Sequence, residues 1–436
     1  MLMKKILLLP VLVFACIYLA GAEKNGKLPQ ITCVTNKNAL AYQPGGEMIF
    51  TFRLDTGRLK AGKYFLAFTR NGDDLKKFSG KAPADKPLVV RTSLDRPGFV
   101  KVDVFLVDEK GRRVSFRENI RWYNRKGNIA FFAGAAVQPE KLRDCGEPAD
   151  FDAFWVRQKK RLAGVPFAGK VEMKTVKTTP AGKVYAVVIP APGPRPATGY
   201  MTIPANAKKG SLPIQINFFG HGNTIQKPPR SVPAGRISFW LNAHGQKLGE
   251  SPAYYKAFFK SICGSKGKYA FDPVENRDPE SCFFNGMVMR VLRSLEFLKT
   301  LPEWDRKHIT ASGNSQGGLQ AMWAGALDKD VTAVFHGITW CCDIAGAVKN
   351  KRLGSEMRPQ YVPGLDYFDP VFMAKRIKNA KVTITRAGLG DYTSPPSGIA
   401  VCYNNLATPD KSITWVQGSD HGFVPEKSEV TVWKNR

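Results

Sequence analysis

Histidine is scarce in this chain, and the residues that usually hold metal ions are not spaced for that role. Only five histidines occur among 436 residues. No two of them have the H-x-x-x-H spacing of a helical metal site, and no C-x-x-C pair is present. We therefore expect neither a metal ion nor another cofactor.

Cysteine is also sparse. Eight cysteines occur in the whole chain, and they are widely separated except for one adjacent pair. The seven that follow residue 22 are an odd set, which does not match the disulfide framework of a small secreted domain. Cys263 and Cys282 flank a loop-like stretch and are the one pair that we considered for a bridge.

Long apolar runs are absent except at the N-terminus. Two lysines precede the apolar segment 6–19, and Ala20-Gly21-Ala22 follows it. This order predicts a signal peptide over residues 1–22 and an exported protein, either periplasmic or secreted. Lipid attachment at Cys16 is the alternative, although apolar residues continue past that cysteine. No other run is long enough to span a bilayer.

Acidic residues are outnumbered by basic ones. The chain has 65 Lys and Arg against 36 Asp and Glu, which gives a formal net charge of +29. The basic residues are scattered, with no block of five or more. Such a charge favours anionic partners, and an exported protein rarely meets nucleic acid. We therefore expect no nucleic acid partner and consider an acidic polysaccharide or an envelope surface. A basic charge common to the whole proteome is the alternative.

The chain changes character near residue 125. Within residues 23–125, short runs such as Met48–Leu54 and Val100–Leu106 alternate between the two faces of a strand, and turn residues separate them. This pattern predicts a small antiparallel β-sandwich, immunoglobulin-like, as an accessory domain. Within residues 126–436, buried strands alternate with helices, which predicts an α/β domain with a mostly parallel sheet flanked by helices.

A Gly-x-Ser-x-Gly motif lies in the second domain. Gly313-Asn314-Ser315-Gln316-Gly317-Gly318 follows the strand-like run 308–312 and precedes the helix-like run 319–327. Between a strand and a helix, this motif is the nucleophile elbow of the α/β-hydrolase fold. Its glycines permit a tight turn that presents the serine hydroxyl beside free N–H groups of a helix. We predict Ser315 as a nucleophile; an ordinary glycine-rich turn is the alternative.

A serine nucleophile needs a histidine base and an acid that orients the histidine. In this fold the acid and then the histidine follow the serine along the chain. His421 lies in a loop just after the strand 412–416, and we predict it as the base. Asp391 directly follows the preceding strand, and we predict it as the acid.

Three other residues are the alternatives. His336 ends an apolar strand close to the elbow, and we expect it to be a buried structural histidine. Asp343 is a rival acid, but it lies one strand too early in the chain. Asp420 is adjacent to the predicted base, and we expect its side chain to point elsewhere.

The tetrahedral intermediate of ester hydrolysis needs an oxyanion hole of two N–H groups. Gln316 follows the nucleophile and is expected to supply one of them from its backbone. The second is expected from the loop after an early buried strand, where Phe219-Gly220-His221-Gly222 occurs. We therefore predict the backbone N–H of His221 as the second donor.

Several segments together resemble one known family. Their sequences are Pro148-Ala149-Asp150-Phe151-Asp152-Ala153-Phe154-Trp155, Ser315-Gln316-Gly317-Gly318, Cys342-Asp343, Gly388-Leu389-Gly390-Asp391, Pro395-Pro396-Ser397 and His421-Gly422. From about Ala149 onward, the chain resembles the acetyl xylan esterase and cephalosporin-C deacetylase family, carbohydrate esterase family 7. The resemblance implies removal of acetyl groups from acetylated oligosaccharides, such as xylo-oligosaccharides, through an acetyl-serine intermediate. It also implies a homo-oligomer, which the added N-terminal domain could block.

Three segments depart from the family pattern. One is Asp420-His421-Gly422-Phe423, which stands where the family has a His-Gly-His-Glu-like ending. Phe219-Gly220-His221 stands where the family usually has a Phe-His-Gly-Tyr-like oxyanion segment, and Asn242-Ala243-His244-Gly245-Gln246 stands where it has Asp-x-Arg-Gly-Gln. These changes leave the ester substrate open. The alternatives to a sugar deacetylase are a lipase-like or peptidase-like α/β-hydrolase and a non-catalytic glycan-binding protein.

Overall fold

The computed structural model describes residues 26–121, 124–355, 357–425 and 428–434. The expected signal peptide, with Cys16, lies outside these residues. Within them, no helix combines the length and the apolar character needed to cross a membrane. Their seven cysteines are all free thiols, so Cys263 and Cys282 do not form the bridge that we considered.

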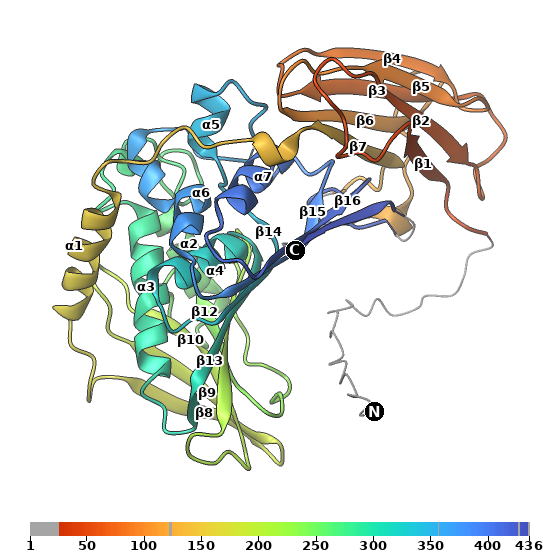
Figure 1. Cartoon of the computed structure of the whole chain (residues 1–436). Helices are drawn as coiled ribbons and strands as arrows, with labels where there is room; N and C mark the ends of the chain where they lie inside the picture. Colours follow the sequence, from red (N-terminus) through yellow and green to blue (C-terminus); the bar gives the residue numbers. More distant parts are fainter. Residues whose placement is uncertain (1–25, 122–123, 356, 426–427, 435–436) are drawn as a thin grey trace, which may run out of the picture.

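Two antiparallel sheets form the N-terminal domain (Figure 1). One has three strands in the order β1-β2-β5, and the other has four in the order β4-β3-β6-β7. Alternate residues of β2 and β6, such as Phe50 and Val102, are buried together in one core, as the period-2 pattern predicts. The strands are β1 (Gln30–Thr35), β2 (Met48–Asp55), β3 (Tyr64–Gly72), β4 (Phe78–Pro83), β5 (Leu88–Thr92), β6 (Gly98–Asp108) and β7 (Ala130–Val137).

Strand β7 continues this sheet past residue 125, where we expected the domain to end. It pairs antiparallel with β6 along its whole length. Its sequence does not alternate between apolar and polar residues, because both of its faces are covered. Ala133 and Ala135 belong to the core of the sandwich, whereas Ala136 belongs to the core of the C-terminal domain.

A ten-stranded sheet forms the centre of the C-terminal domain, in the order β17-β16-β15-β14-β13-β11-β12-β10-β9-β8. The six strands β11 to β16 are parallel, and the strands at both edges are antiparallel. The strands are β8 (Glu172–Thr179), β9 (Gly182–Ile189), β10 (Ala197–Pro204), β11 (Leu212–Phe218), β12 (Ile237–Asn242), β13 (Trp304–Ser315), β14 (Ala333–Thr339), β15 (Lys381–Gly388), β16 (Lys411–Val416) and β17 (Val430–Lys434).

Helices α4, α3 and α1 lie side by side in this order on one side of the sheet, with α4 packed on β11, β13 and β14 and α3 packed on β9 and β10 (Figure 1). Because α3 lies between the other two, it is buried along nearly its whole length. The α-helices are α1 (Phe151–Ala163), α2 (Pro252–Ile262), α3 (Phe283–Leu298), α4 (Gln316–Leu327), α5 (Ile344–Lys349), α6 (Pro370–Met373) and α7 (Pro396–Asn405). The short 3-10 helices are η1 (Arg117–Asn119), η2 (Pro139–Lys141), η3 (Glu275–Arg277), η4 (Pro363–Phe368) and η5 (Ala374–Arg376).

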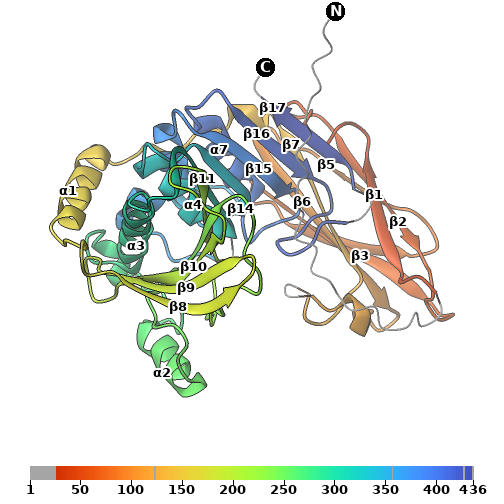
Figure 2. The ribbon, with the colours of Figure 1, turned by 90° about the horizontal axis from the view of Figure 1, so that it is seen from below.

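The sandwich packs against the β15 and β16 side of the large sheet (Figure 2). Phe99 of β6 contacts Trp415 of β16, with 5.5 Å between the ring centroids. Both rings are buried, so the contact removes apolar surface from water and fixes one domain against the other.

Candidate active site

The order of strands in the large sheet places two predicted loops side by side. The chain runs from β11 to β12 on one side and then returns to β13 on the other side of β11. In α/β sheets, ligand sites form at the carboxyl ends of the strands where the order reverses in this way. The loop after β11 carries His221, and the end of β13 carries Ser315. The fold therefore brings the predicted nucleophile and the predicted oxyanion loop to one edge.

Ser315 joins β13 to α4 in a strained backbone conformation, with φ 57° and ψ −120°. Two glycines give this turn its room. A Cβ on Gly317 would lie 2.4 Å from the carbonyl oxygen of Phe218, and one on Gly318 would lie 2.2 Å from that of Ile338. Both values are far inside van der Waals contact. The glycines of the motif are therefore needed because the start of α4 packs directly on β11 and β14.

Ser315, His421 and Asp391 form a continuous hydrogen-bonded chain. The Ser315 hydroxyl donates to His421 Nε2 over 2.9 Å, and His421 Nδ1 donates to Asp391 Oδ2 over 2.8 Å. The backbone N–H groups of Thr393 and Ser394 donate to Asp391 Oδ1, each over 3.0 Å, and hold the carboxylate in place. All three predicted side chains are buried, which strengthens the bonds between them.

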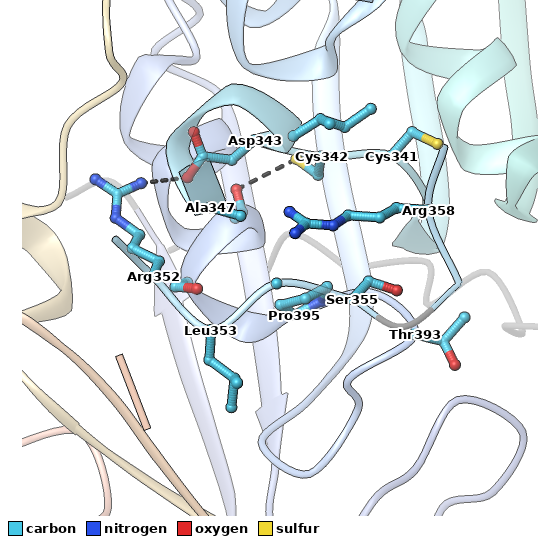
Figure 3. A pocket seen from close by; sticks show the side chains of 14 residues that line it. Cys341, Cys342, Asp343, Ala347, Arg352, Leu353, Ser355, Arg358, Thr393 and Pro395 are labelled. Carbon is cyan, nitrogen blue, oxygen red and sulfur yellow. Dashed lines mark hydrogen bonds and ion pairs between the residues drawn. The ribbon is translucent and has the colours of Figure 1, made fainter. Parts of the chain in front are cut away.

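The alternative residues are engaged elsewhere. His336 is buried beside Thr339, whose hydroxyl lies 3.1 Å from Nδ1, and burial lowers the pKa of His336 to about 4. Asp343 forms an ion pair with Arg352 on the wall of a small cavity (Figure 3). Asp420 accepts a backbone N–H of its own loop over 2.9 Å. Of these candidates, Asp391 is the acid that reaches His421.

The site offers no obvious set of metal ligands. Within the part of the chain that the structure describes, no three His, Cys, Asp or Glu residues are grouped so that they could hold a metal ion.

Tyr269 connects the two sides of the predicted oxyanion hole, and sequence reasoning missed it. Its hydroxyl accepts the Gly222 N–H over 2.9 Å and donates to Gln316 Oε1 over 2.8 Å. Only 1% of Tyr269 is exposed, and burial raises its pKa, so the hydroxyl keeps the proton that it donates. No pattern marks this residue, because it lies in the irregular segment between α2 and α3.

The side chain of His221 belongs to a group of rings near the nucleophile. It stacks on Tyr269 with 4.3 Å between the centroids, and it contacts Trp340 at 5.1 Å. The backbone N–H of Trp340 donates to the carbonyl of Ser315 over 3.1 Å. Burial, together with the nearby charge of Lys268, lowers the pKa of His221 to about 4, so this imidazole is neutral at pH 7.

His244, one of the departures from the family pattern, supports the same loop. Its Nε2 lies 3.1 Å from the carbonyl oxygen of Gly222, and burial lowers its pKa to about 3. The neutral ring therefore donates to the Gly222 carbonyl, while Tyr269 accepts the N–H of the same residue. Two buried side chains thus fix the position of the residue that follows His221.

The N-terminal domain contacts both loops that carry the acid and the base. A Cβ on Gly134 of β7 would lie 2.3 Å from the carbonyl oxygen of Leu389, two residues before Asp391. The side chain of Gln417, which leads into the loop of His421, bonds to the backbone of Gly134 over 2.8 and 2.9 Å. The sandwich is therefore a direct support of the site and not a separate attachment.

The chain is similar in sequence and in structure to known esterases. The family model described as acetyl xylan esterase (AXE1) matches residues 141–436, more than half of the chain. The chain belongs to the acetyl xylan esterase family. The matched region starts just after β7, so it contains the Ser315, His421 and Asp391 cluster and excludes the sandwich.

Individual relatives agree with this assignment. The chain is 28% identical over 300 residues to acetyl esterase Axe7A of Xylanibacter ruminicola, an alignment that covers 66% of this chain and 67% of that protein. Among solved structures, an acetyl xylan esterase from Paenibacillus sp. R4 aligns with a TM-score of 0.54 and 23% identity, covering 66% of this chain and 94% of that one. Acetyl xylan esterase 1 from Thermoanaerobacterium sp. JW/SL YS485 aligns with a TM-score of 0.53 and 20% identity over the same shares.

The resemblance and the fold class predicted from the sequence are confirmed. The chain is a carboxylic ester hydrolase, which excludes the purely glycan-binding alternative, and its C-terminal domain has the α/β-hydrolase fold that it shares with the two solved esterases.

Proposed function

We propose that this protein is an exported serine esterase that removes acetyl groups from acetylated xylo-oligosaccharides or related sugars. The observation that carries the proposal is the hydrogen-bonded chain from Ser315 through His421 to Asp391 in a member of the acetyl xylan esterase family. The name of the curated relative, an acetyl esterase, supports acetate as the acyl group. The lysine pair, apolar run and small residues at the N-terminus support export to the periplasm or the medium.

In the first half of the proposed reaction, Ser315 Oγ attacks the acetyl carbonyl carbon while His421 Nε2 takes its proton. Asp391 holds the imidazole in the tautomer with its proton on Nδ1 and stabilises the imidazolium. The tetrahedral intermediate collapses as the bond to the sugar oxygen breaks, and His421 returns the proton to that oxygen. The sugar leaves as an alcohol, and the acetyl group stays on Ser315.

In the second half, water attacks the acetyl-serine with His421 again as the base. A second tetrahedral intermediate breaks to free acetate and the serine hydroxyl. In both halves, the backbone N–H groups of Gln316 and His221 stabilise the oxyanion, at about 3 kcal/mol for each donor. Tyr269 positions these donors through the hydrogen bonds described above.

Aromatic residues beside the nucleophile support a small acyl group. The rings of Phe271 and Trp340 stack at 5.8 Å, and His221 contacts Phe271 at 5.7 Å. We infer that these packed rings restrict the space for a long acyl chain. This packing favours acetyl esters over the long-chain esters of a lipase and over peptides.

The test compares acyl groups on the purified chain. We expect acetate release from acetylated xylo-oligosaccharides and from acetylated monosaccharides, with rates that fall steeply for butyryl and longer esters. The Ser315→Ala variant should lose this activity. Preference for long-chain esters or cleavage of peptides would reject the proposed acyl group, and an undiminished Ser315→Ala variant would reject the nucleophile.

A further inference from the structure

A groove of about 440 Å³ lies between the two domains, and basic residues dominate its walls. Arg96 comes from the sandwich, and the other basic residues come from the segment around η2, from the end of α5 and from the residues that follow it. They are Arg96, Lys141, Arg143, Lys349, Lys351 and Arg352. The acidic residues of the groove are Asp73 and Asp144. The net charge of the lining is therefore strongly positive.

Both acids are already engaged by the protein. Asp73 accepts the backbone N–H groups of Phe99 and Leu353, over 2.8 and 3.0 Å. Asp144 forms an ion pair with Lys375 over 3.1 Å and accepts a hydrogen bond from an asparagine side chain over 2.8 Å. Neither acid forms an ion pair with one of the six basic side chains of the groove; burial raises the pKa of Asp73, and the nearby charges of Arg352 and Arg96 act in the opposite direction.

Four of the basic side chains form no ion pair with an acidic side chain among the described residues. The ion pairs there involve Lys349 and Arg352, but not Arg96, Lys141, Arg143 or Lys351. Arg96 and Arg143 donate to backbone carbonyls, which satisfies their hydrogen bonds without cancelling their charge. All four side chains are exposed and can reach a ligand.

The walls of the groove are held in a fixed arrangement. Arg96 of the sandwich donates to the carbonyl of Lys351, and Asp73 accepts the N–H of Leu353, so two bonds cross between the domains at this point. A concave, preorganised surface with unpaired cations fits a flexible anionic chain better than it fits the flat surface of a membrane.

We propose that this groove binds a segment of an acidic polysaccharide, with uronate carboxylates pairing with Arg96, Lys141, Arg143 and Lys351. Arg352 lines both the groove and the small cavity of Figure 3, which extends to Thr393 in the loop after Asp391. Through this shared wall the groove adjoins the loop that carries Asp391, so a chain held in the groove would raise the concentration of acetyl groups around the site. That advantage rests on the proposed esterase function, whereas the binding itself does not.

The test measures binding of the intact chain to polygalacturonate, a polymer of uronate, and to a neutral xylan as a comparison. The double variant Lys141→Gln/Lys351→Gln removes two charges from the groove. The matched control, Lys174→Gln/Lys256→Gln, removes two charges from exposed positions on β8 and α2. We expect wild type to bind the uronate polymer in low salt, with at least tenfold weaker binding for the groove variant and less than twofold for the control. Added salt should weaken the binding of wild type.

Three results would overturn the proposal. One is no binding of polygalacturonate by wild type. Another is an equal loss in both double variants, which would assign binding to the overall charge. The third is preferential binding to vesicles rich in phosphatidylserine, which would assign the surface to a membrane. Binding of polygalacturonate by a protein that releases no acetate from acetylated xylo-oligosaccharides would instead reject the proposed function and leave this site standing.

Discussion

The Tyr269→Phe substitution tests the structural account of the oxyanion hole. It removes one oxygen that accepts the Gly222 N–H and donates to Gln316 Oε1, while the ring stays in its packing. Each buried polar group that loses its partner costs about 1–3 kcal/mol. The two predicted oxyanion donors lie on the segments that this hydroxyl joins, and each is worth about 3 kcal/mol in the transition state.

If the substitution loosens the two segments enough to lose a third to a half of one donor's contribution, the barrier rises by about 1–1.5 kcal/mol, or roughly tenfold in rate. We therefore expect kcat for a small acetyl ester to fall by about 5- to 15-fold, with KM within about twofold, because donors to the oxyanion act mainly in the transition state. Steady-state kinetics with an acetylated monosaccharide measures both constants.

Tyr255→Phe is the matched control. The Tyr255 hydroxyl is also buried between two backbone groups, with Lys247 O as acceptor and the Glu250 N–H as donor, but it lies on α2 away from the elbow. Both variants should lose a similar amount of stability in thermal unfolding. Equal and small effects on kcat in the two variants would refute the idea that Tyr269 positions the oxyanion donors.

Four further substitutions probe other parts of the site and the fold. Asp391→Asn should lower kcat by about 10⁴-fold because the imidazole loses its orienting acid, whereas Asp343→Asn should have a far smaller effect in the same kinetic assay. Gly134→Ala places a Cβ 2.3 Å from the Leu389 carbonyl and should lower kcat through the displaced acid loop, by up to about 100-fold for a shift of about 1 Å. His336 has a folded pKa of about 4, below the value of about 6.5 for an unfolded chain. The contribution of the neutral His336 to the free energy of unfolding is therefore complete above about pH 6.5 and is lost as the pH falls toward 4. Between pH 7 and pH 5, the free energy of unfolding measured with denaturant should fall by about 2 kcal/mol more for wild type than for His336→Gln.

Each of these expectations is contradicted by a particular result. A larger loss for Asp343→Asn than for Asp391→Asn would move the acid to the earlier strand. A wild-type rate for Gly134→Ala would mean that the sandwich does not support the site. Parallel pH dependences for wild type and His336→Gln would place the proton uptake on other groups.

The candidate residues of the site could be predicted because the proposed chemistry requires particular residue types at particular positions in the sequence. The elbow requires glycines at fixed spacing, since Gly317 and Gly318 lie against strand carbonyls. The order of nucleophile, acid and base along the chain of an α/β-hydrolase then points to Asp391 after β15 and His421 after β16. The position of the His221 loop, directly after the early buried strand β11, likewise indicated the second oxyanion donor. Local motif and topology therefore sufficed to nominate these residues.

Other features depend on contacts between distant segments, which no local pattern records. Tyr269 lies in an irregular loop, and its role arises only where that loop meets the elbow. Strand β7 is covered by a different domain on each face, so its apolar and polar residues do not alternate. The domain boundary that we expected at residue 125 therefore lies before this strand, although the strand belongs to the sandwich. The basic groove joins Arg96 to residues far along the chain, such as Lys351. The scattered charge of the sequence could not indicate where it gathers.

The central claim is that Ser315 carries the acetyl group during turnover. The direct measurement is acid quenching of the enzyme during hydrolysis of an acetylated xylo-oligosaccharide, followed by mass spectrometry of the peptide that contains Ser315. The account predicts one acetyl group on Ser315 in wild type and none in Ser315→Ala. It also predicts that the amount of acetylated Ser315 rises with the concentration of the acetylated substrate until the enzyme is saturated. An acetyl group on another residue, or acetate release by Ser315→Ala at the wild-type rate, would contradict the account.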